Sequence, residues 1–148
     1  MVFPMKKKSP PPPGSDNAAA RRRLTELRGA LLSLHKALVD SERLSYETTL
    51  GQVASPNHFL QLLISDPWFA WLHPLSQLIV SIDESLADGE PLTAATADAL
   101  ARQAALLLAP AEDGQEFSGH YYEALQRDPD VVLAHAEVVK QIGPKRKS

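Results

Sequence analysis

The sequence predicts an all-α protein, folded as a compact bundle of five or six helices. Apolar residues recur with a helical period almost everywhere after residue 18, and no segment alternates apolar and polar residues as a half-buried strand would. Residues that start and stop helices, such as Ser-Pro, Asp-Pro and Gly, stand between the apolar segments. A chain of 148 residues with 44% hydrophobic composition can bury one core, which predicts a single helical domain over residues 19–143.

The first predicted helix runs from about Ala18 to Leu50. The apolar residues on its predicted core side are spaced three and four positions apart and are Leu24, Leu27, Leu31, Leu34 and Leu38. The same spacing then reaches Ser41, Ser45 and Thr48, so the stripe becomes polar in its second half. Either this end of the helix projects beyond the core, or Ser41, Glu42 and Ser45 line a polar cavity.

Two proline-led helices follow in the middle of the chain. Ser55 is expected to cap a short helix whose first residue is Pro56, where the missing N–H of proline costs nothing. Asp66 and Pro67 begin a longer helix that ends near residue 89. Within it Pro74 predicts a kink, because an internal proline removes a backbone hydrogen bond.

Three further helices complete the predicted bundle. Thr93 begins an alanine-rich helix, and residues 110–114 separate it from a short helix over residues 116–127. Asp128 and Pro129 begin the last helix, which residues 143–144 (Gly-Pro) end.

Part of the sequence recurs at an offset of 62 residues. His58, Asp66-Pro67 and His73 correspond to His120, Asp128-Pro129 and His135. The predicted helices before and after residue 90 also follow the same order: a longer, a short and a longer helix. The bundle is therefore either two related three-helix units or a single unit in which two helix–helix connections are alike. Both aspartates are interpreted as N-caps.

The histidines raise the alternative of a metal or haem site. His120 has a carboxylate four residues before it, Glu116, and another three residues after it, Glu123, so one helix face could present all three. The other candidate ligands are His58, His73 and His135. Cysteine is absent, which excludes thiolate sites. The expected cofactor under this alternative is a transition metal or haem; otherwise none is expected.

The chain's two tryptophans, Trp68 and Trp71, are three residues apart and share a helix face. Core packing is the first interpretation, because large aromatic residues dominate burial. The alternative is a small-ligand sensor whose pocket is formed by Trp68, Trp71, His73 and Glu42.

Charge is divided between the ends and the body of the chain. Residues 1–18 combine basic residues with a proline run and predict a disordered lead, and residues 144–148 form a basic tail. Between residues 24 and 144 the chain has six basic and seventeen acidic residues, a net charge of −11. An acidic body disfavours nucleic acid except through the tails. Short apolar runs and the lack of a signal peptide predict no membrane association and a cytoplasmic location.

Catalytic motifs are not evident in the sequence. There is no glycine-rich phosphate loop, nucleophile elbow or paired-carboxylate arrangement, so enzymatic activity is not the favoured expectation. The leucine stripe and the acidic body favour a non-enzymatic helical bundle that acts through protein–protein interaction, with a protein partner or as a homodimer. The long first helix and the alanine-rich helix are the expected contact surfaces.

Overall fold

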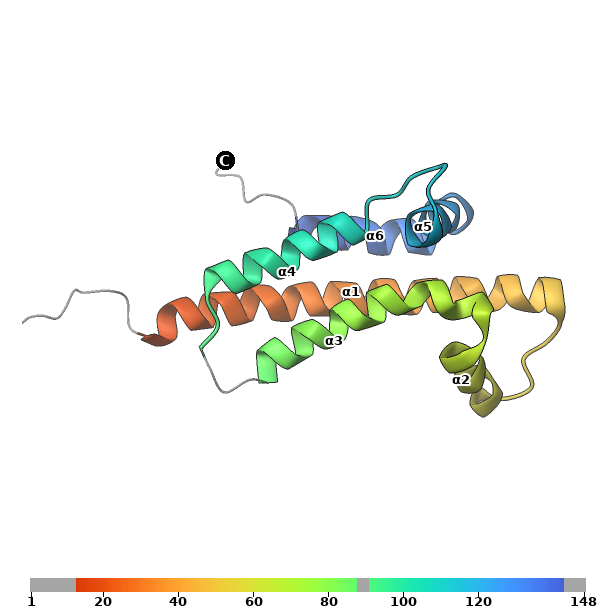
Figure 1. The fold of residues 1–148 in the computed structure, drawn as a ribbon, viewed down its shortest axis with the longest axis horizontal. Coiled ribbons are helices and arrows are strands. Elements are labelled where there is room, and N and C mark those ends of the chain that lie inside the picture. Colours follow the sequence, from red (N-terminus) through yellow and green to blue (C-terminus); the bar gives the residue numbers. More distant parts are fainter. Residues whose placement is uncertain (1–12, 88–90, 143–148) are drawn as a thin grey trace, which may run out of the picture.

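The computed structural model describes residues 13–87 and 91–142, and it confirms the all-α prediction (Figure 1). This part of the chain has no strand. Its elements are six α-helices and one 3₁₀ helix: α1 (Pro13–Leu50), α2 (Pro56–Ser65), η2 (Pro67–Leu72), α3 (His73–Ala87), α4 (Ala94–Leu107), α5 (Glu116–Arg127) and α6 (Pro129–Ile142).

Helix α1 runs along almost the whole length of the molecule (Figure 1). Its 38 residues span about 57 Å at the helical rise of about 1.5 Å per residue. Helices α3, α4 and α6 pack along it. Near the C-terminal half of α1, the 3₁₀ helix η2 packs against α1 and α5, while α2 packs against η2 and α5 also packs against α6 (Figure 1).

The predicted leucine stripe forms the centre of the core. Its five leucines, from Leu24 to Leu38, are at most 1% exposed. The polar continuation of the stripe is buried too, because Ser41 and Glu42 remain only 4% and 7% exposed. The second half of α1 therefore does not simply project beyond the core, and the interpretation that these residues line a polar cavity is the one the structure supports.

Helix α1 begins earlier than predicted. Residues 13–18 belong to it rather than to a disordered lead. One contact holds this earlier part of the helix: the Asn17 side-chain Oδ1 accepts a hydrogen bond from the backbone N–H of Leu92 at 2.6 Å. Residues 1–12 of the predicted lead and the basic tail of residues 144–148 lie outside the described residues.

The kink predicted at Pro74 is wrong. The segment after Asp66 is two elements, because the chain forms the 3₁₀ helix η2 as far as Leu72 and a separate helix, α3, starts at His73. Pro74 is therefore the second residue of α3, where its missing N–H would have no partner in the helix in any case.

The predicted N-caps Ser55, Asp66 and Asp128 are confirmed, and Thr93, where a helix start is predicted, caps its helix in the same way. Each side-chain oxygen accepts a hydrogen bond from a backbone N–H two or three residues ahead, which satisfies one of the free donors of a helix start. The pairs are Ser55 with His58 at 3.0 Å, Asp66 with Trp68 at 2.8 Å, Thr93 with Thr96 at 3.1 Å, and Asp128 with Asp130 at 2.9 Å.

None of the described helices combines the length and the apolar composition that crossing a membrane requires.

Candidate functional site

Three elements that are distant in the sequence enclose a pocket of about 360 Å³. Helix α1 forms one wall, η2 the second and α5 the third. We name this cavity the tryptophan pocket; its lining residues are Glu42, Ser45, Pro67, Trp68, Trp71, His120, Glu123 and Arg127. The pocket therefore contains three of the four residues predicted for a ligand site: Trp68, Trp71 and Glu42.

The geometry of η2 places both tryptophans in the pocket. In a 3₁₀ helix, residues three apart lie on the same edge, because each turn takes three residues. Phe69 and Leu72 form one such pair and are buried in the core at 1% and 2% exposure. Trp68 and Trp71 form another pair, and both line the pocket.

Aromatic neighbours hold the two indoles in position. The ring of Trp68 meets Tyr46 edge to face, with centroids 5.6 Å apart and planes at 87°. Trp71 has an edge contact with Phe117 at 5.2 Å and a stacked contact with His120, also at 5.2 Å, with planes 18° apart. Both rings of this stacked pair line the pocket.

The indole nitrogens of both tryptophans lack hydrogen-bond partners. In the described part of the chain, only three side-chain nitrogen or oxygen atoms are buried without a partner, and two of them are the Nε1 atoms of Trp68 and Trp71. A buried donor without an acceptor costs about 1–3 kcal/mol. Core packing thus accounts for the rings of these tryptophans but leaves their N–H groups unexplained.

An ion pair connects the α1 and α5 walls. The guanidinium of Arg127 donates from Nη2 to Glu42 Oε2 at 2.8 Å, and from Nε and Nη2 to Ser41 Oγ at 3.2 and 3.0 Å. The Glu42 side chain is 9% exposed and that of Arg127 is 39% exposed. Arg127 and Ser45 also line a neighbouring cavity of about 430 Å³ together with Leu44, so the ion pair stands between the two spaces.

His73, the fourth predicted pocket residue, is not in the tryptophan pocket. It lines a different cavity of about 310 Å³ with His35, Ser76 and apolar side chains of α2 and η2. The Nε2 atom of His35 is 3.0 Å from the Ser76 hydroxyl, and burial lowers the pKa of His35. The prediction placed His73 beside the tryptophans because it assumed one continuous helix, whereas the change from 3₁₀ to α geometry occurs at His73 itself.

The predicted metal ligands do not assemble into one site. Within residues 13–87 and 91–142, no group of three or more His, Asp or Glu side chains is placed to hold a metal ion. His120 and Glu123 share the tryptophan pocket, but Glu116 does not line it. Glu116 is the first residue of α5, and its φ of 55° lies outside the range of a regular α-helix. The helical spacing that would place Glu116 on the same face as His120 therefore does not extend to Glu116.

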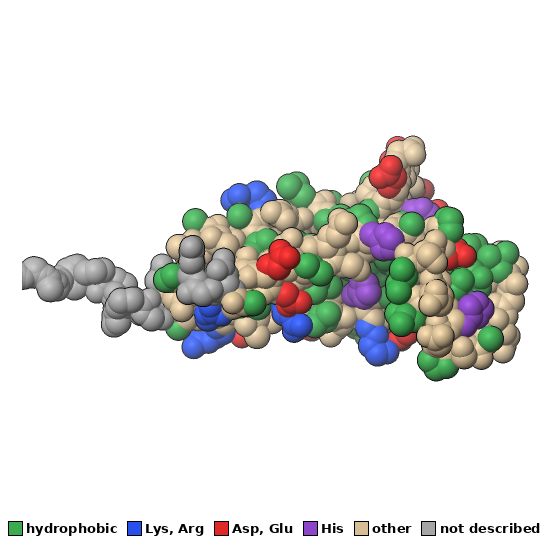
Figure 2. Space-filling view, turned by 60° about the horizontal axis from the view of Figure 1, so that its bottom comes forward, with side chains coloured by type: hydrophobic (Ala, Val, Ile, Leu, Met, Phe, Trp, Pro, Cys, Tyr) green, Lys and Arg blue, Asp and Glu red, His purple; other side chains and the backbone are tan. Residues whose placement is uncertain are grey.

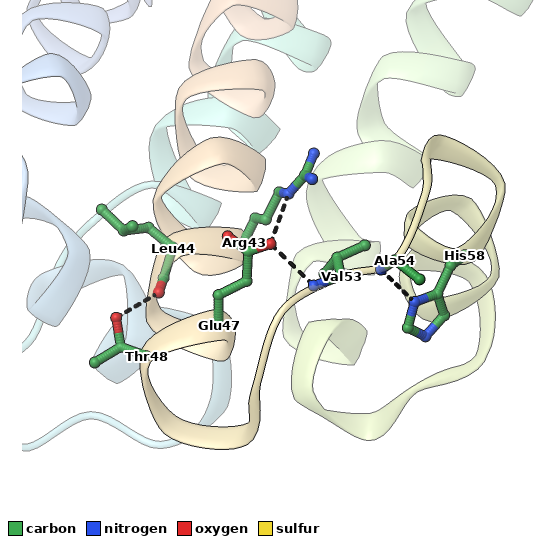
Figure 3. A network of polar contacts seen from close by, with 7 residues as sticks. All are labelled: Arg43, Leu44, Glu47, Thr48, Val53, Ala54 and His58. Carbon is green, nitrogen blue, oxygen red and sulfur yellow. Dashed lines mark hydrogen bonds and ion pairs between the residues drawn. The ribbon is translucent and has the colours of Figure 1, made fainter.

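The remaining predicted ligands have hydrogen bonds of their own. His58 Nδ1 accepts a hydrogen bond from the backbone N–H of Ala54 at 3.0 Å, in the turn where Glu47 binds the N–H of Val53 (Figure 3). His135 Nδ1 is 2.6 Å from the Tyr121 hydroxyl, and burial lowers the pKa of His135.

On the face shown in Figure 2, histidine side chains are set among apolar side chains, several of them near one another and one apart.

Arg127 is the pocket residue that the sequence did not indicate. It is separated from Glu42 by 85 positions and follows no motif. The only sequence signal was indirect, since Glu42 stands in the polar half of a buried stripe and a buried carboxylate requires a cationic or hydrogen-bonding partner.

Comparison of the chain with models of known protein families, with curated proteins and with solved structures gave no significant match. The functional proposals that follow therefore rest on the geometry of the chain.

Proposed function

We propose that this protein is a small-ligand sensor and that the tryptophan pocket is its binding site. The observation that carries the proposal is the meeting of both tryptophans of the chain with the Glu42–Arg127 ion pair around one pocket of about 360 Å³.

The size and lining of the pocket support this function. Small-molecule sites are concave, have apolar or aromatic walls and contain a few polar groups, with volumes of about 300–1,000 Å³. The tryptophan pocket has about 360 Å³, an aromatic wall and the Glu42–Arg127 pair. Its volume suits a ligand about the size of a single ring with one or two substituents.

Tryptophan fluorescence provides a direct test. Both tryptophans of the chain line the pocket, so the whole tryptophan emission reports on this site. Titration with a panel of small amides, carboxylates, amines and aromatic heterocycles is expected to give a saturable change in emission for at least one compound class.

A pocket-filling variant and a matched control complete the test. Ser45→Phe places a ring in the pocket and is expected to abolish the response, whereas Ser33→Phe adds the same ring at an exposed position of the same helix and is expected to preserve it. If no compound changes the emission, or if Ser45→Phe responds like the wild type, the proposed function is wrong.

A second candidate function is protein–protein interaction, including self-association, and it is favoured by the outer face of α6. Val132 and Val139 are each 45% exposed, and Leu133 is 67% exposed. Residues 132 and 139 are seven apart and so lie on the same side of the helix. Sedimentation equilibrium of the wild type and of Leu133→Lys tests this candidate: a dimer that the substitution dissociates supports it, and a monomeric wild type contradicts self-association.

A further inference from the structure

We propose that Ser76 is a reactive serine for which His35 is the base, and that it accepts the acyl group of small, uncharged esters. This inference concerns a different cavity and goes beyond the proposed function of the tryptophan pocket. It follows from the contact between the two side chains, from the helices that hold them and from the lining of the cavity beside them.

The hydroxyl of Ser76 has a partner on another helix. A hydroxyl on a helix commonly bonds to a backbone carbonyl of the preceding turn. Thr48 and Ser65 do so, each donating to the carbonyl four residues earlier, at 2.9 and 2.8 Å. Ser76 Oγ instead lies 3.0 Å from Nε2 of His35. The contact therefore joins α3 to α1 rather than two turns of one helix.

The distance between these two atoms suits proton transfer from the serine to the imidazole. A nucleophile and its base act together when their heavy atoms lie about 2.6–3.2 Å apart. Burial lowers the pKa of His35, so its imidazole is neutral at pH 7 and has one nitrogen without a proton. In the tautomer with the proton on Nδ1, Nε2 accepts the hydrogen of the Ser76 hydroxyl, which makes the oxygen a better nucleophile.

Two packed helices fix the position of the pair. His35 belongs to α1 and Ser76 to α3, and these helices pack along each other (Figure 1). Their sequence neighbours Leu34 and Leu75 are fully buried in the core. Groups on packed helices are held more precisely than groups on loops. The contact between Oγ and Nε2 is therefore a stable feature of the fold.

The cavity beside the pair fits a small apolar acyl group. Its volume is about 310 Å³, and both His35 and Ser76 line it. The other lining residues are Leu63, Ile64, Phe69, Leu72 and His73. This lining contains no carboxylate, ammonium or guanidinium group, so it offers no partner for a charged substrate, whose desolvation would be costly. The expected substrate class is therefore a small ester with an aliphatic acyl group.

The proposed reaction is an acyl transfer. Ser76 Oγ attacks the carbonyl carbon of the ester, and its proton moves to Nε2 of His35. The bond between this carbon and the alcohol oxygen then breaks, and the alcohol leaves with the proton from the imidazole. The products are one free alcohol and a serine that carries the acyl group, with His35 neutral again.

Two esters test the reaction and its substrate class. Full-length protein mixed with p-nitrophenyl butyrate at pH 7 is expected to release p-nitrophenolate, and mass spectrometry of acid-quenched protein is expected to place one butyryl group on Ser76. Relative to uncatalysed hydrolysis, p-nitrophenyl acetate is expected to react about tenfold more slowly, because its acyl group has two fewer methylenes to bury in the apolar cavity.

Two variants with matched controls test the pair. Ser76→Ala removes the nucleophile and is expected to abolish butyrylation, and His35→Gln removes the base and is expected to slow it by about tenfold or more. The controls are Ser81→Ala, on the same helix, and His135→Gln, at the histidine that contacts the Tyr121 hydroxyl. Both controls should react like the wild type, and tryptophan emission like that of the wild type shows that each variant is folded.

A further variant and the possible outcomes complete the test. Ser76→Cys keeps a nucleophile at the same position and is expected to retain a butyryl group there. A wild type without a butyryl group on Ser76, or Ser76→Ala that reacts like the wild type, overturns the reactive serine. His35→Gln that reacts like the wild type overturns the role of His35, and equal relative rates for the two esters overturn the apolar substrate class.

Discussion

At the scale of single residues, Arg127 of α5 connects two walls of the tryptophan pocket. Its guanidinium binds the carboxylate of Glu42 and the hydroxyl of Ser41, both of which are buried on α1. Without Arg127, the Glu42 carboxylate would remain in a largely desolvated position with no cation beside it. The pair therefore contributes both to stability and to the position of the Glu42 carboxylate in the pocket.

Replacement of Arg127 is expected to destabilise the protein. Arg127→Met should lower the free energy of unfolding by about 1–3 kcal/mol, because it removes hydrogen bonds to a buried charged group. The matched control is Lys140→Met, which breaks the exposed Lys140–Glu137 pair on α6 and should cost less than about 0.5 kcal/mol. Urea unfolding measures both values, and equal losses in the two variants would contradict the assigned role of Arg127.

At the scale of the helix, Gly119 determines how closely α5 packs against the loop that precedes it. A Cβ atom at this position would collide with the backbone carbonyl of Gly114, in the loop that precedes the helix. Backbone atoms yield less readily than the end of a side chain, so the loop and the start of α5 can approach each other only when residue 119 is glycine. Helix α5 carries His120, Glu123 and Arg127, and its position therefore determines one wall of the pocket.

An alanine scan of two glycines tests this packing. Gly119→Ala is expected to destabilise the protein by about 1–3 kcal/mol through overpacking and to weaken ligand binding by displacing α5. Gly29→Ala lies within α1, where a Cβ would meet nothing within 4 Å, and it should stabilise the protein by about 0.5–1 kcal/mol. Thermal unfolding compares the two, and a neutral Gly119→Ala would show that the loop adjusts freely.

Elements that depend on local contacts were predictable from the sequence. The leucine stripe and the caps at Ser55, Asp66, Thr93 and Asp128 depend on residues within one or two turns of each other, and the structure confirms all of them. The 3₁₀ geometry of η2 was not predictable, because a spacing of three residues between two tryptophans fits both an α-helix and a 3₁₀ helix. The kink at Pro74 was predicted wrongly for that reason.

The candidate site was predictable only in part, because it depends on how helices distant in the sequence pack together in the whole molecule. Trp68, Trp71 and Glu42 were predicted as pocket residues from local pattern alone. Arg127 lies 85 positions from Glu42, and no local pattern indicates which faces of two distant helices will meet. His120 and Glu123 were predicted as metal ligands and not as pocket residues, because the approach of His120 to Trp71 depends on the packing of α5 against η2.

The stability of the whole molecule is expected to depend on pH through two histidines. Burial lowers the pKa of His35 and of His135 below the value of 6.5 that an unfolded chain would show. The unfolded state then binds more protons than the folded state at mildly acidic pH, so the stability that these residues contribute is present above about pH 6.5 and is lost as the pH falls below it.

Unfolding by urea between pH 8 and pH 5 measures this dependence. The free energy of unfolding is expected to decrease below about pH 6.5, and the double variant His35→Gln, His135→Gln should show a weaker decrease over the same range. The variant Ser33→Gln is the control, since it places the same side chain at an exposed position of α1 that has no titratable group and should leave the slope unchanged. A slope in the double variant equal to that of the wild type would contradict the contribution of the two buried imidazoles.

The most direct measurement of ligand binding is the NMR spectrum of the two indole N–H groups. Protein labelled with ¹⁵N at its two tryptophans should give two indole signals, and both Nε1 atoms are buried without a hydrogen-bond partner in the described part of the chain. On titration with the compound panel, both signals are expected to shift and to saturate with one dissociation constant for at least one compound class, because both indole rings line the pocket, and Ser45→Phe should abolish the shifts. Indole signals that do not move with any compound of the panel would contradict the claim that the tryptophan pocket is a ligand site.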